Sequence, residues 1–180
     1  PMTKEEHRDF VDTILSNARK MNAIINALRL LASVRKEDVE TNVVNMEVMV
    51  QEALRRLRHR IDERDTTLTL PDTWIPVRGY GPWIEEVWTN YLGNALTYGG
   101  TPCEIVIGVE DLGENVRYWI RDNGVGFSED KLESLLHTFS RLSELNVEGH
   151  GLGLSIVARI IQKLGGTMSA ESTIGKGSVF

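Results

Sequence analysis

The chain has 180 residues, of which 41% are hydrophobic, and its formal net charge is −6 at pH 7. This length accommodates one ordinary domain and an additional segment. The acidic balance argues against a nucleic-acid surface, which requires a basic patch. No apolar run approaches the roughly 18 residues of a membrane-spanning helix, and no signal-peptide pattern opens the sequence. The single cysteine, Cys103, excludes an internal disulfide, and we expect a cytoplasmic setting.

A heptad pattern marks the N-terminal part of the chain. Apolar residues follow one another at spacings of three and four from Val11 to Ala32, as in a helix that packs against another helix. Phe10, Ile24 and Leu31 widen this stripe, as a helical bundle requires. We therefore prefer a bundle helix to a helix folded against its own domain, and we assign residues 1–40 to a separate helical segment.

A short extended piece at residues 41–44 and a second helix are predicted next. Asn45 is a suitable N-cap for this helix. Its buried face consists of Met46, Met49, Val50, Ala53, Leu54, Leu57 and Ile61. Its other face carries Arg55, Arg56, Arg58 and Arg60. We interpret these arginines as a solvated surface, because no aromatic residues interleave with them as in a nucleic-acid site.

After residue 65 the pattern becomes mixed α/β. Strands are predicted at 66–70, 75–80, 103–109, 115–121 and 167–172, and helices at 82–98 and 152–164. Pro82 suits the first turn of one helix, and Gly165 and Gly166 end the other. Ser128 is a candidate cap of a further short helix. Because strands and helices do not alternate strictly, we expect an α+β fold, a two-layer α/β sandwich with helices on one face of a mixed sheet.

Two asparagines stand one turn apart on the predicted helix 82–98. Asn90 and Asn94 lie at the edge of its buried stripe, and Thr97 continues their row. Asparagine is unfavourable inside a helix, because its amide competes for backbone hydrogen bonds. An amide oxygen is also a hard ligand, suited to a Mg²⁺ shell completed by phosphates and waters. The pair therefore indicates either a metal site or two amides that hydrogen-bond to a neighbouring loop.

Two glycine-containing motifs follow. The first lies at the end of a strand and reads Asp122-Asn-Gly124-Val-Gly126. A carboxylate there can accept a hydrogen bond from an exocyclic amine such as that of adenine, and glycines let the backbone approach a flat ring. Alone, this motif also describes an ordinary turn. Gly149-His-Gly151-Leu-Gly153-Leu-Ser155 opens a helix, whose free N–H groups suit phosphate oxygens. A dinucleotide fingerprint would follow directly from a strand, and residues 140–148 are polar and irregular. Together the three motifs predict a pocket for ATP and a divalent metal.

These motifs resemble the N, G1 and G2 boxes of the Bergerat-fold ATP-binding domain. Sensor histidine kinases share this domain with gyrase-type topoisomerases and related chaperones, and they are the nearest match. Their F box resembles Thr138-Phe139-Ser140-Arg141, and their final signature resembles Gly165-Gly166 together with residues 175–180. The first helix looks like the second helix of their dimerisation and phosphotransfer hairpin. The resemblance thus implies a partial hairpin at residues 1–40 and a catalytic ATP-binding domain at 41–180, truncated at its C-terminus.

The resemblance also implies roles for single residues. Asn94 would be the Mg²⁺ ligand, and Asn90 would contact the phosphates or the metal shell; these two are the expected catalytic residues. Tyr98 would lie beside the adenine, Asp122 would read its amino group, and Arg141 would contact phosphate. The complete expected ATP-binding set is Asn90, Asn94, Tyr98, Asp122, Gly124, Gly126, Arg141, Gly149, Gly151, Leu152 and Gly153.

An activity and partners are implied as well. Members of the family transfer the γ-phosphoryl group of ATP to a histidine on the dimerisation domain, and an aspartate of a response-regulator receiver domain then receives it. The implied cofactors are ATP and Mg²⁺. The implied partners are a response regulator and a second copy, joined through the helical hairpin of the parent protein; no nucleic acid is implied, and a membrane only through parts of the parent outside this chain. Hydrolytic relatives carry a Glu where Asn90 stands, and an amide cannot act as that base, so transfer is favoured over hydrolysis.

Two departures from the family pattern limit this expectation. Thr97 stands where a Lys or Arg often meets the phosphates, which predicts a lower ATP affinity. The phosphoacceptor motif, a His followed by an acidic residue and then a Pro, is missing, since His7 is followed by Arg-Asp-Phe. We therefore expect a fragment that holds the donor half of the reaction only. The alternative is a catalytically degenerate Bergerat-fold module that serves as a dimerisation or interaction domain.

Overall fold

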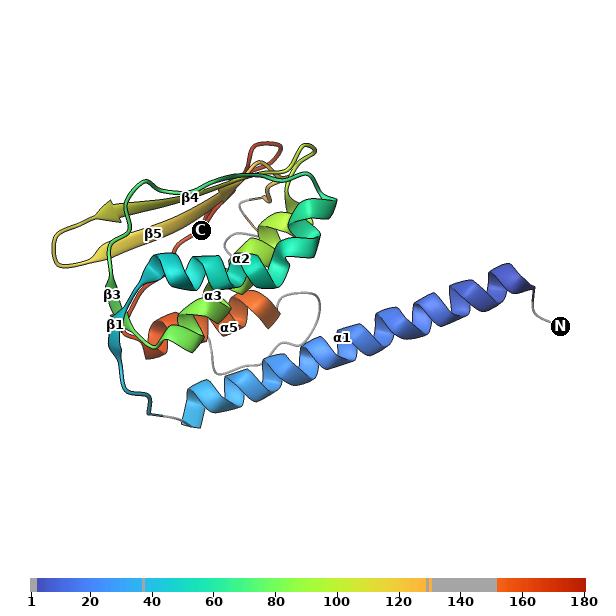
Figure 1. Ribbon diagram of the computed structural model, residues 1–180, viewed down its shortest axis with the longest axis horizontal. Helices are drawn as coiled ribbons and strands as arrows, with labels where there is room; N and C mark the ends of the chain where they lie inside the picture. Colours follow the sequence, from blue (N-terminus) through green and yellow to red (C-terminus); the bar gives the residue numbers. More distant parts are fainter. Residues whose placement is uncertain (1–2, 37, 129, 131–151) are drawn as a thin grey trace. The chain divides into compact units, whose positions relative to one another are not determined.

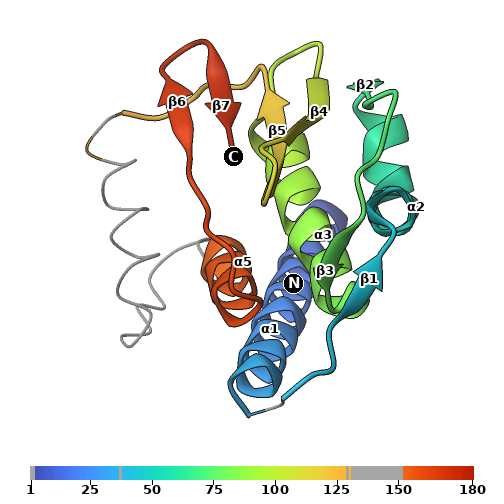
Figure 2. The same ribbon diagram turned by 90° about the vertical axis from the view of Figure 1, so that its left-hand side faces the viewer.

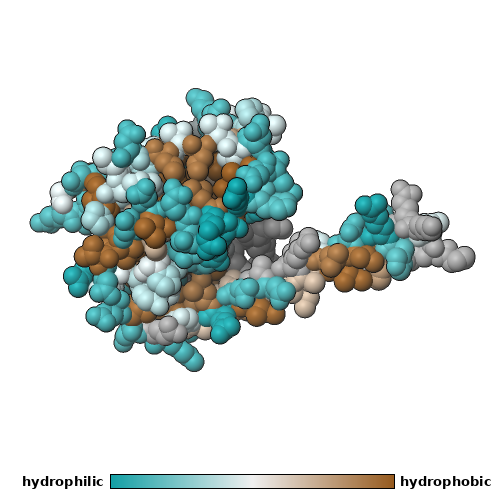
Figure 3. Space-filling view, in the orientation of Figure 1, coloured by the Kyte–Doolittle hydropathy of each residue, from teal (hydrophilic) through white to brown (hydrophobic). Residues whose placement is uncertain are grey.

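The computed structural model describes residues 3–36, 38–128, 130 and 152–180. The chain divides into two compact units, Pro1–Glu37 and Asp38–Phe180. The first unit contains one long helix, α1 (Lys4–Lys36). Large apolar side chains of α1 lie at its surface (Figure 3), namely Phe10, Val11, Ile14, Leu15, Met21, Ile24, Ile25 and Leu28. The predicted helix is confirmed, and its heptad stripe is exposed.

The second unit is a two-layer α/β structure. Its elements in chain order are β1 (Asn42–Val44), α2 (Met46–Glu63), β2 (Thr67–Thr69), β3 (Val77–Gly79), α3 (Gly81–Tyr98), β4 (Glu104–Asp111), β5 (Val116–Asp122), α5 (Leu152–Lys163), β6 (Glu171–Thr173) and β7 (Gly177–Val179). Five strands form one sheet in the order β2-β4-β5-β7-β6, and β1 and β3 form a separate ladder. Only the β2–β4 pair of the five-stranded sheet is parallel. Helices α2, α3 and α5 cover one face of this sheet (Figures 1 and 2), as predicted.

Helix α3 lies at the centre of the helical layer, and its apolar stripe forms the middle of the core. Leu92 and Leu96 of α3 are almost completely buried, together with Ile105 and Ile107 of β4 and Val50 of α2. Each such side chain contributes about 1.5–3 kcal/mol by leaving water. The core thus fixes both the position and the rotation of α3, and with them the side of the helix that carries Asn90 and Asn94.

Local sequence signals explain most of the element boundaries. Asn45 caps α2, because its side-chain Oδ1 accepts a hydrogen bond from the backbone N–H of Val48 at 3.3 Å. Pro82 lies in the first turn of α3, and Gly165, with φ of +79°, follows the end of α5. Cys103 is buried as expected, directly before β4. The helix predicted after Ser128 lies outside the described residues.

One sequence interpretation is corrected by the structure. The strand expected at residues 167–172 is shorter and later, and it forms a hairpin of β6 and β7 closed by Gly175 and Gly177, which both have positive φ. The arginines of α2 are exposed, as interpreted, but two of them also contact a neighbouring helix. Arg55 and Arg58 pair with neighbours on α2 itself, whereas Arg56 and Arg60 hydrogen-bond to α3. None of the helices in the described ranges is long and apolar enough to cross a bilayer.

Candidate functional site

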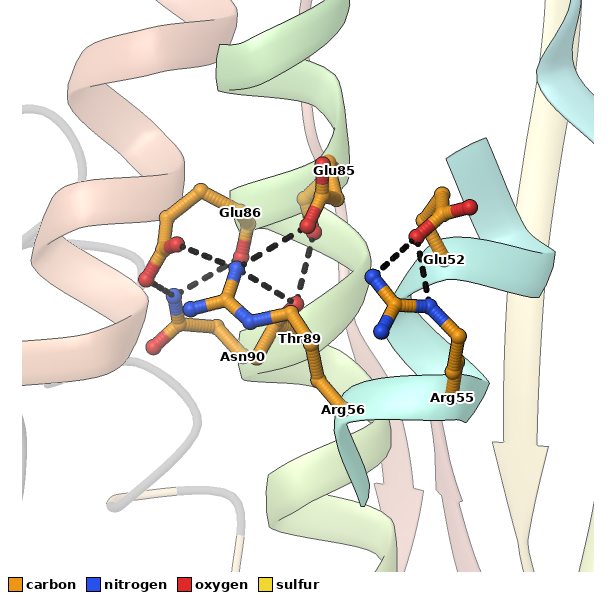
Figure 4. A network of polar contacts seen from close by, with 7 residues as sticks. All are labelled: Glu52, Arg55, Arg56, Glu85, Glu86, Thr89 and Asn90. Carbon is orange, nitrogen blue, oxygen red and sulfur yellow. Dashed lines mark hydrogen bonds and ion pairs between the residues drawn. The ribbon is translucent and has the colours of Figure 1, made fainter. Parts of the chain in front are cut away.

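The amide of Asn90 is held in one orientation on α3. Its Nδ2 donates to the backbone oxygen of Glu86 at 2.8 Å and lies 3.5 Å from the Glu86 carboxylate (Figure 4). With both donors turned toward Glu86, the amide oxygen is left to face the start of α5. The orientation of this side chain is therefore set by the turn of helix that precedes it.

Gly153 brings the start of α5 against Asn90. A Cβ atom built on Gly153 would lie 2.5 Å from Asn90 Oδ1, a separation that real Cβ atoms do not show. Only glycine fits here without moving the amide. The N-box residue Asn90 and the glycine-rich motif at 149–155 are thus in direct contact, although 62 residues separate Asn90 from Gly153 in the sequence.

Asn94, one turn further along α3, is half-buried. Among the described residues its side chain has no hydrogen-bond partner, which distinguishes it from Asn90. A half-buried amide is costly to leave unsatisfied, by about 1–3 kcal/mol when the group is fully desolvated. Asn90 thus bonds to its own helix, and the role of Asn94 as a metal ligand stays a prediction.

Asp122 ends β5 as a buried carboxylate, only 8% exposed. Its Oδ1 accepts a hydrogen bond from the backbone N–H of Gly124 at 2.8 Å. Burial raises the pKa of Asp122 above its ordinary value, while the hydrogen bonds from the backbone of Gly124 and Ser178 act in the opposite direction. A buried acceptor with a raised pKa suits recognition of an amine donor.

The two glycines of the Asp122 motif are required by backbone packing. A Cβ on Gly124 would lie 2.1 Å from the backbone oxygen of Tyr98, and one on Gly126, whose φ is +62°, would lie 2.1 Å from the oxygen of Thr173. Val125 N–H also donates to the Tyr98 oxygen at 3.3 Å. The motif is therefore joined to the end of α3, and contact of these glycines with a base stays a prediction.

Tyr98 is half exposed at the C-terminal end of α3, beside this junction.

The sequence analysis missed the role of Asn123, whose side-chain oxygen accepts hydrogen bonds from the backbone N–H groups of Gly100 and Glu104, both at 3.0 Å. Its Nδ2 donates to the oxygen of Pro102 at 2.8 Å. Asn123 thus fixes the loop between α3 and β4. An Asn between an Asp and a Gly was the available signal, but it reads equally well as a turn residue.

A charged network lies at the N-terminal end of the row that Asn90 and Asn94 form on α3, here called the asparagine row. Arg56 of α2 lies between Glu85 and Glu86 at 3.2 and 3.1 Å, and its Nη1 also reaches Thr89 Oγ1 at 3.5 Å (Figure 4). Burial acts to lower the pKa of Arg56, but the two carboxylates outweigh it and the pKa is raised. The network connects α2 to the carboxylate that Asn90 faces.

The remaining expected site residues are only partly described. Leu152 is the first residue of α5. Arg141, Gly149 and Gly151 lie outside the described residues. In the structure Gly153 thus meets Asn90, and Gly124, which Asp122 accepts a hydrogen bond from, meets the backbone of Tyr98 at the end of α3, with Asn94 between Asn90 and Tyr98 along the helix.

Comparisons with known proteins agree with this geometry. The family model described as histidine kinase-, DNA gyrase B- and HSP90-like ATPase matches residues 79–180, which contain all three motifs. The chain belongs to this family. The matched segment begins at the end of β3 and runs through α3, β4, β5, α5 and the closing hairpin.

The methanogenesis regulatory histidine kinase FilI of Methanothrix harundinacea is 35% identical over 132 residues, which cover 72% of this chain and 15% of FilI. The sensor protein SrrB of Staphylococcus aureus (strain N315) is 26% identical over 185 residues, or 98% of this chain and 31% of SrrB. The chain therefore spans less than a third of the length of these curated relatives. The histidine kinase ThkA, solved in complex with the response regulator TrrA, has the same fold, with a TM-score of 0.77 at 22% identity over all of this chain and 51% of ThkA.

Proposed function

We propose that this chain is the ATP-binding catalytic part of a two-component sensor histidine kinase. It takes the γ-phosphoryl group of Mg·ATP and delivers it to a histidine that this sequence does not contain. One observation carries the proposal, namely the convergence of the three motifs. Asn90 Oδ1 faces Gly153, and the backbone of Tyr98 meets Gly124 beside the buried Asp122.

The adenine end of the site would be formed by Asp122 and Tyr98. The Asp122 carboxylate has an oxygen held by the backbone N–H of Gly124, and it would accept a hydrogen bond from the exocyclic amine of adenine. Tyr98, half exposed at the end of α3, would lie along the ring, and Gly124 and Gly126 would border it. Because a guanine offers a carbonyl at the corresponding position, this arrangement favours adenine nucleotides.

The phosphate end would be formed by the asparagine row and the start of α5. The residues fit a Mg²⁺ ion, because the amide oxygen of Asn94 has no partner among the described residues and that of Asn90 is turned away from Glu86. Asn94 would ligate the ion and Asn90 would complete its shell through an oxygen or a water. When bound, Mg²⁺ neutralises charge on the phosphate oxygens. Backbone N–H groups of Gly149, Gly151, Leu152 and Gly153, and the side chain of Arg141, would contact the phosphates.

The chain contributes positioning and charge neutralisation to the transfer. In the reaction the bond between the γ-phosphorus and the β,γ-bridging oxygen breaks, a bond between phosphorus and an imidazole nitrogen forms, and ADP leaves. Asn90 has no basic group and cannot activate water for hydrolysis. Polar groups fixed before substrate arrives, such as the amide oxygen of Asn90, lower the barrier because they need no reorganisation.

Further elements of the proposal concern the parent protein. Residues 1–40 would form the second helix of a dimerisation hairpin, and residues 41–180 the catalytic domain. The exposed apolar stripe of α1 supports a homodimer through that hairpin. A response-regulator receiver domain would accept the phosphoryl group, as the complex of ThkA with TrrA suggests. The setting would be cytoplasmic.

Phosphotransfer from labelled ATP tests this proposal. The chain is mixed with a separately supplied dimerisation hairpin that carries a phosphoacceptor histidine, and label on the hairpin is measured. We expect Mg²⁺-dependent transfer that Asn94→Ala and Asp122→Ala abolish and that Arg58→Ala, on the solvated side of α2, leaves intact. Nucleotide binding without any transfer would instead identify the degenerate module, and a wild-type chain that binds no ATP would refute both the site and its chemistry.

A further inference from the structure

The arginines on one edge of α2 form a row that faces α3. Arg56 and Arg60 of α2 stand four residues apart, as do Arg60 and Arg64, the residue at the C-cap of α2, so the three lie on one side of this helix. Each reaches a different level of α3. Arg56 contacts Glu85 and Glu86, Arg60 contacts Gly93 and Thr97, and Arg64 contacts the carbonyl groups at the end of the helix.

The charges of the three arginines are balanced differently. The charge of Arg56 is neutralised by two carboxylates at 3.1 and 3.2 Å. Arg64 lies on the last carbonyl groups of α3, where the helix dipole presents negative potential. Arg60 forms no ion pair within the described part of the chain, and its hydrogen bonds go to two neutral oxygens. Arg60 therefore carries the least compensated charge of the row.

Arg60 also retains free donor groups. Its Nη2 donates to Thr97 Oγ1 at 2.8 Å and to the backbone oxygen of Gly93 at 3.2 Å. A guanidinium has five N–H donors, and those on Nε and Nη1 have no partner among residues 3–36, 38–128 and 152–180. A planar cation with donors in reserve is suited to bidentate contact with a phosphate group.

The position of Arg60 places this cation beside the asparagine row. Gly93 immediately precedes Asn94, and Thr97 lies three residues beyond it, so Thr97 is a neighbour of Asn94 on the helix surface and both anchors of Arg60 lie to one side of Asn94. Gly93 has no side chain that could screen the guanidinium, and Nη1 would lie 3.6 Å from a Cβ atom there. Glu85 and Glu86 at the other end of the row disfavour a polyanion, and Arg56 offsets only part of their charge.

We propose that Arg60 is a phosphate-binding residue of the nucleotide site, contributed by α2 from outside the three motifs. This inference rests on the proposed function, since it assigns a contact for the same Mg·ATP. The side chain at position 97 carries no charge, and through its hydroxyl it holds the guanidinium of Arg60 over the row. Arg60 thereby supplies the positive charge that the asparagine row itself lacks.

Affinity measurements with two ligands test the inference. Dissociation constants of Mg·ATP and of adenosine are measured by calorimetry for the wild type, Arg60→Ala, Arg60→Lys and the control Arg58→Ala, which removes a charge from the same helix at a side chain that is 82% exposed. We expect Arg60→Ala to weaken Mg·ATP about tenfold, the effect of losing one charged hydrogen bond, and to leave adenosine unchanged. Arg60→Lys keeps the charge but not the bidentate contact, so it loses less affinity than Arg60→Ala, and Arg58→Ala changes neither ligand.

Two outcomes overturn the inference. If Arg60→Ala binds Mg·ATP as tightly as Arg58→Ala does, Arg60 makes no phosphate contact. If Arg60→Ala weakens adenosine and Mg·ATP equally, Arg60 acts by packing α2 on α3, and a lowered thermal unfolding temperature will accompany the loss. A wild-type chain that binds adenosine but shows no phosphate-dependent gain with Mg·ATP refutes the proposed function itself.

Discussion

Replacement of Gly153 by alanine separates the local steric role of this residue from ordinary helix propensity. A Cβ atom at position 153 would lie 2.5 Å from Asn90 Oδ1, at least half an ångström closer than real Cβ contacts. Relief requires the Asn90 amide to rotate, which breaks the 2.8 Å hydrogen bond from its Nδ2 to the oxygen of Glu86. That hydrogen bond contributes about 0.5–1.5 kcal/mol to stability.

The displaced amide also loses its orientation toward the phosphate end of the site. We therefore expect Gly153→Ala to lower the free energy of unfolding by about 1 kcal/mol, measured by urea denaturation, and to weaken Mg·ATP binding by about tenfold or more. Gly93→Ala is the matched control, because its Cβ meets nothing closer than Arg60 Nη1 at 3.6 Å. Helix propensity favours alanine by up to about 1 kcal/mol, so this variant should be stabilised. A Gly153→Ala chain that gains stability and binds Mg·ATP normally would refute the steric reasoning.

Three further outcomes are expected. Arg64→Ala removes hydrogen bonds to the oxygens of Thr97, Gly99 and Gly100 at 3.3, 3.2 and 3.4 Å, together with one to Leu96, and should lower the free energy of unfolding by about 2 kcal/mol in urea, whereas Arg58→Ala should not. Asn45→Ala removes the cap of α2 and should cost about 1 kcal/mol by the same assay; an unchanged midpoint would show that the 3.3 Å contact contributes nothing. Because burial raises the pKa of Asp122, its carboxylate takes up a proton at a pH above the ordinary value of 3.8, and ATP affinity should fall as the pH is lowered through that raised pKa. The pH profile of the affinity, compared with that of Asp122→Asn, checks this, since the variant should lack the step.

Most of the fold could be predicted from the helical periodicity of apolar residues. Helix α3 was predictable because Pro82 lies in its first turn and its apolar residues recur with the helical period, which places Asn90 and Asn94 at the border of the buried stripe. The convergence of the motifs was predictable only through family resemblance. No local signal reveals that Gly153 touches Asn90, because that contact depends on how α5 packs against α3.

Other features could not be predicted because their partners are distant in sequence. Arg56 and Arg60 look like solvated residues on their own helix, and their partners on α3 lie 29 to 37 residues away. Strands β6 and β7 have three residues each, too short for an alternating pattern, and their hairpin is determined by Gly175 and Gly177 and by the side chain of Ser172. In each case the structure follows from tertiary contacts and not from local propensity.

The spacing of the arginines has a consequence for how this domain tolerates change. One added residue in α2 between Arg56 and Arg60 would turn the rest of the helix by about 100°. Arg60 and Arg64 would then leave α3 together, and the apolar residue Ile61 would turn away from the core with them. Single residues of α2 can therefore be replaced one at a time. The length of α2, in contrast, is fixed by its contacts with α3. We expect single-residue insertions in α2 to abolish nucleotide binding even where the chain still folds.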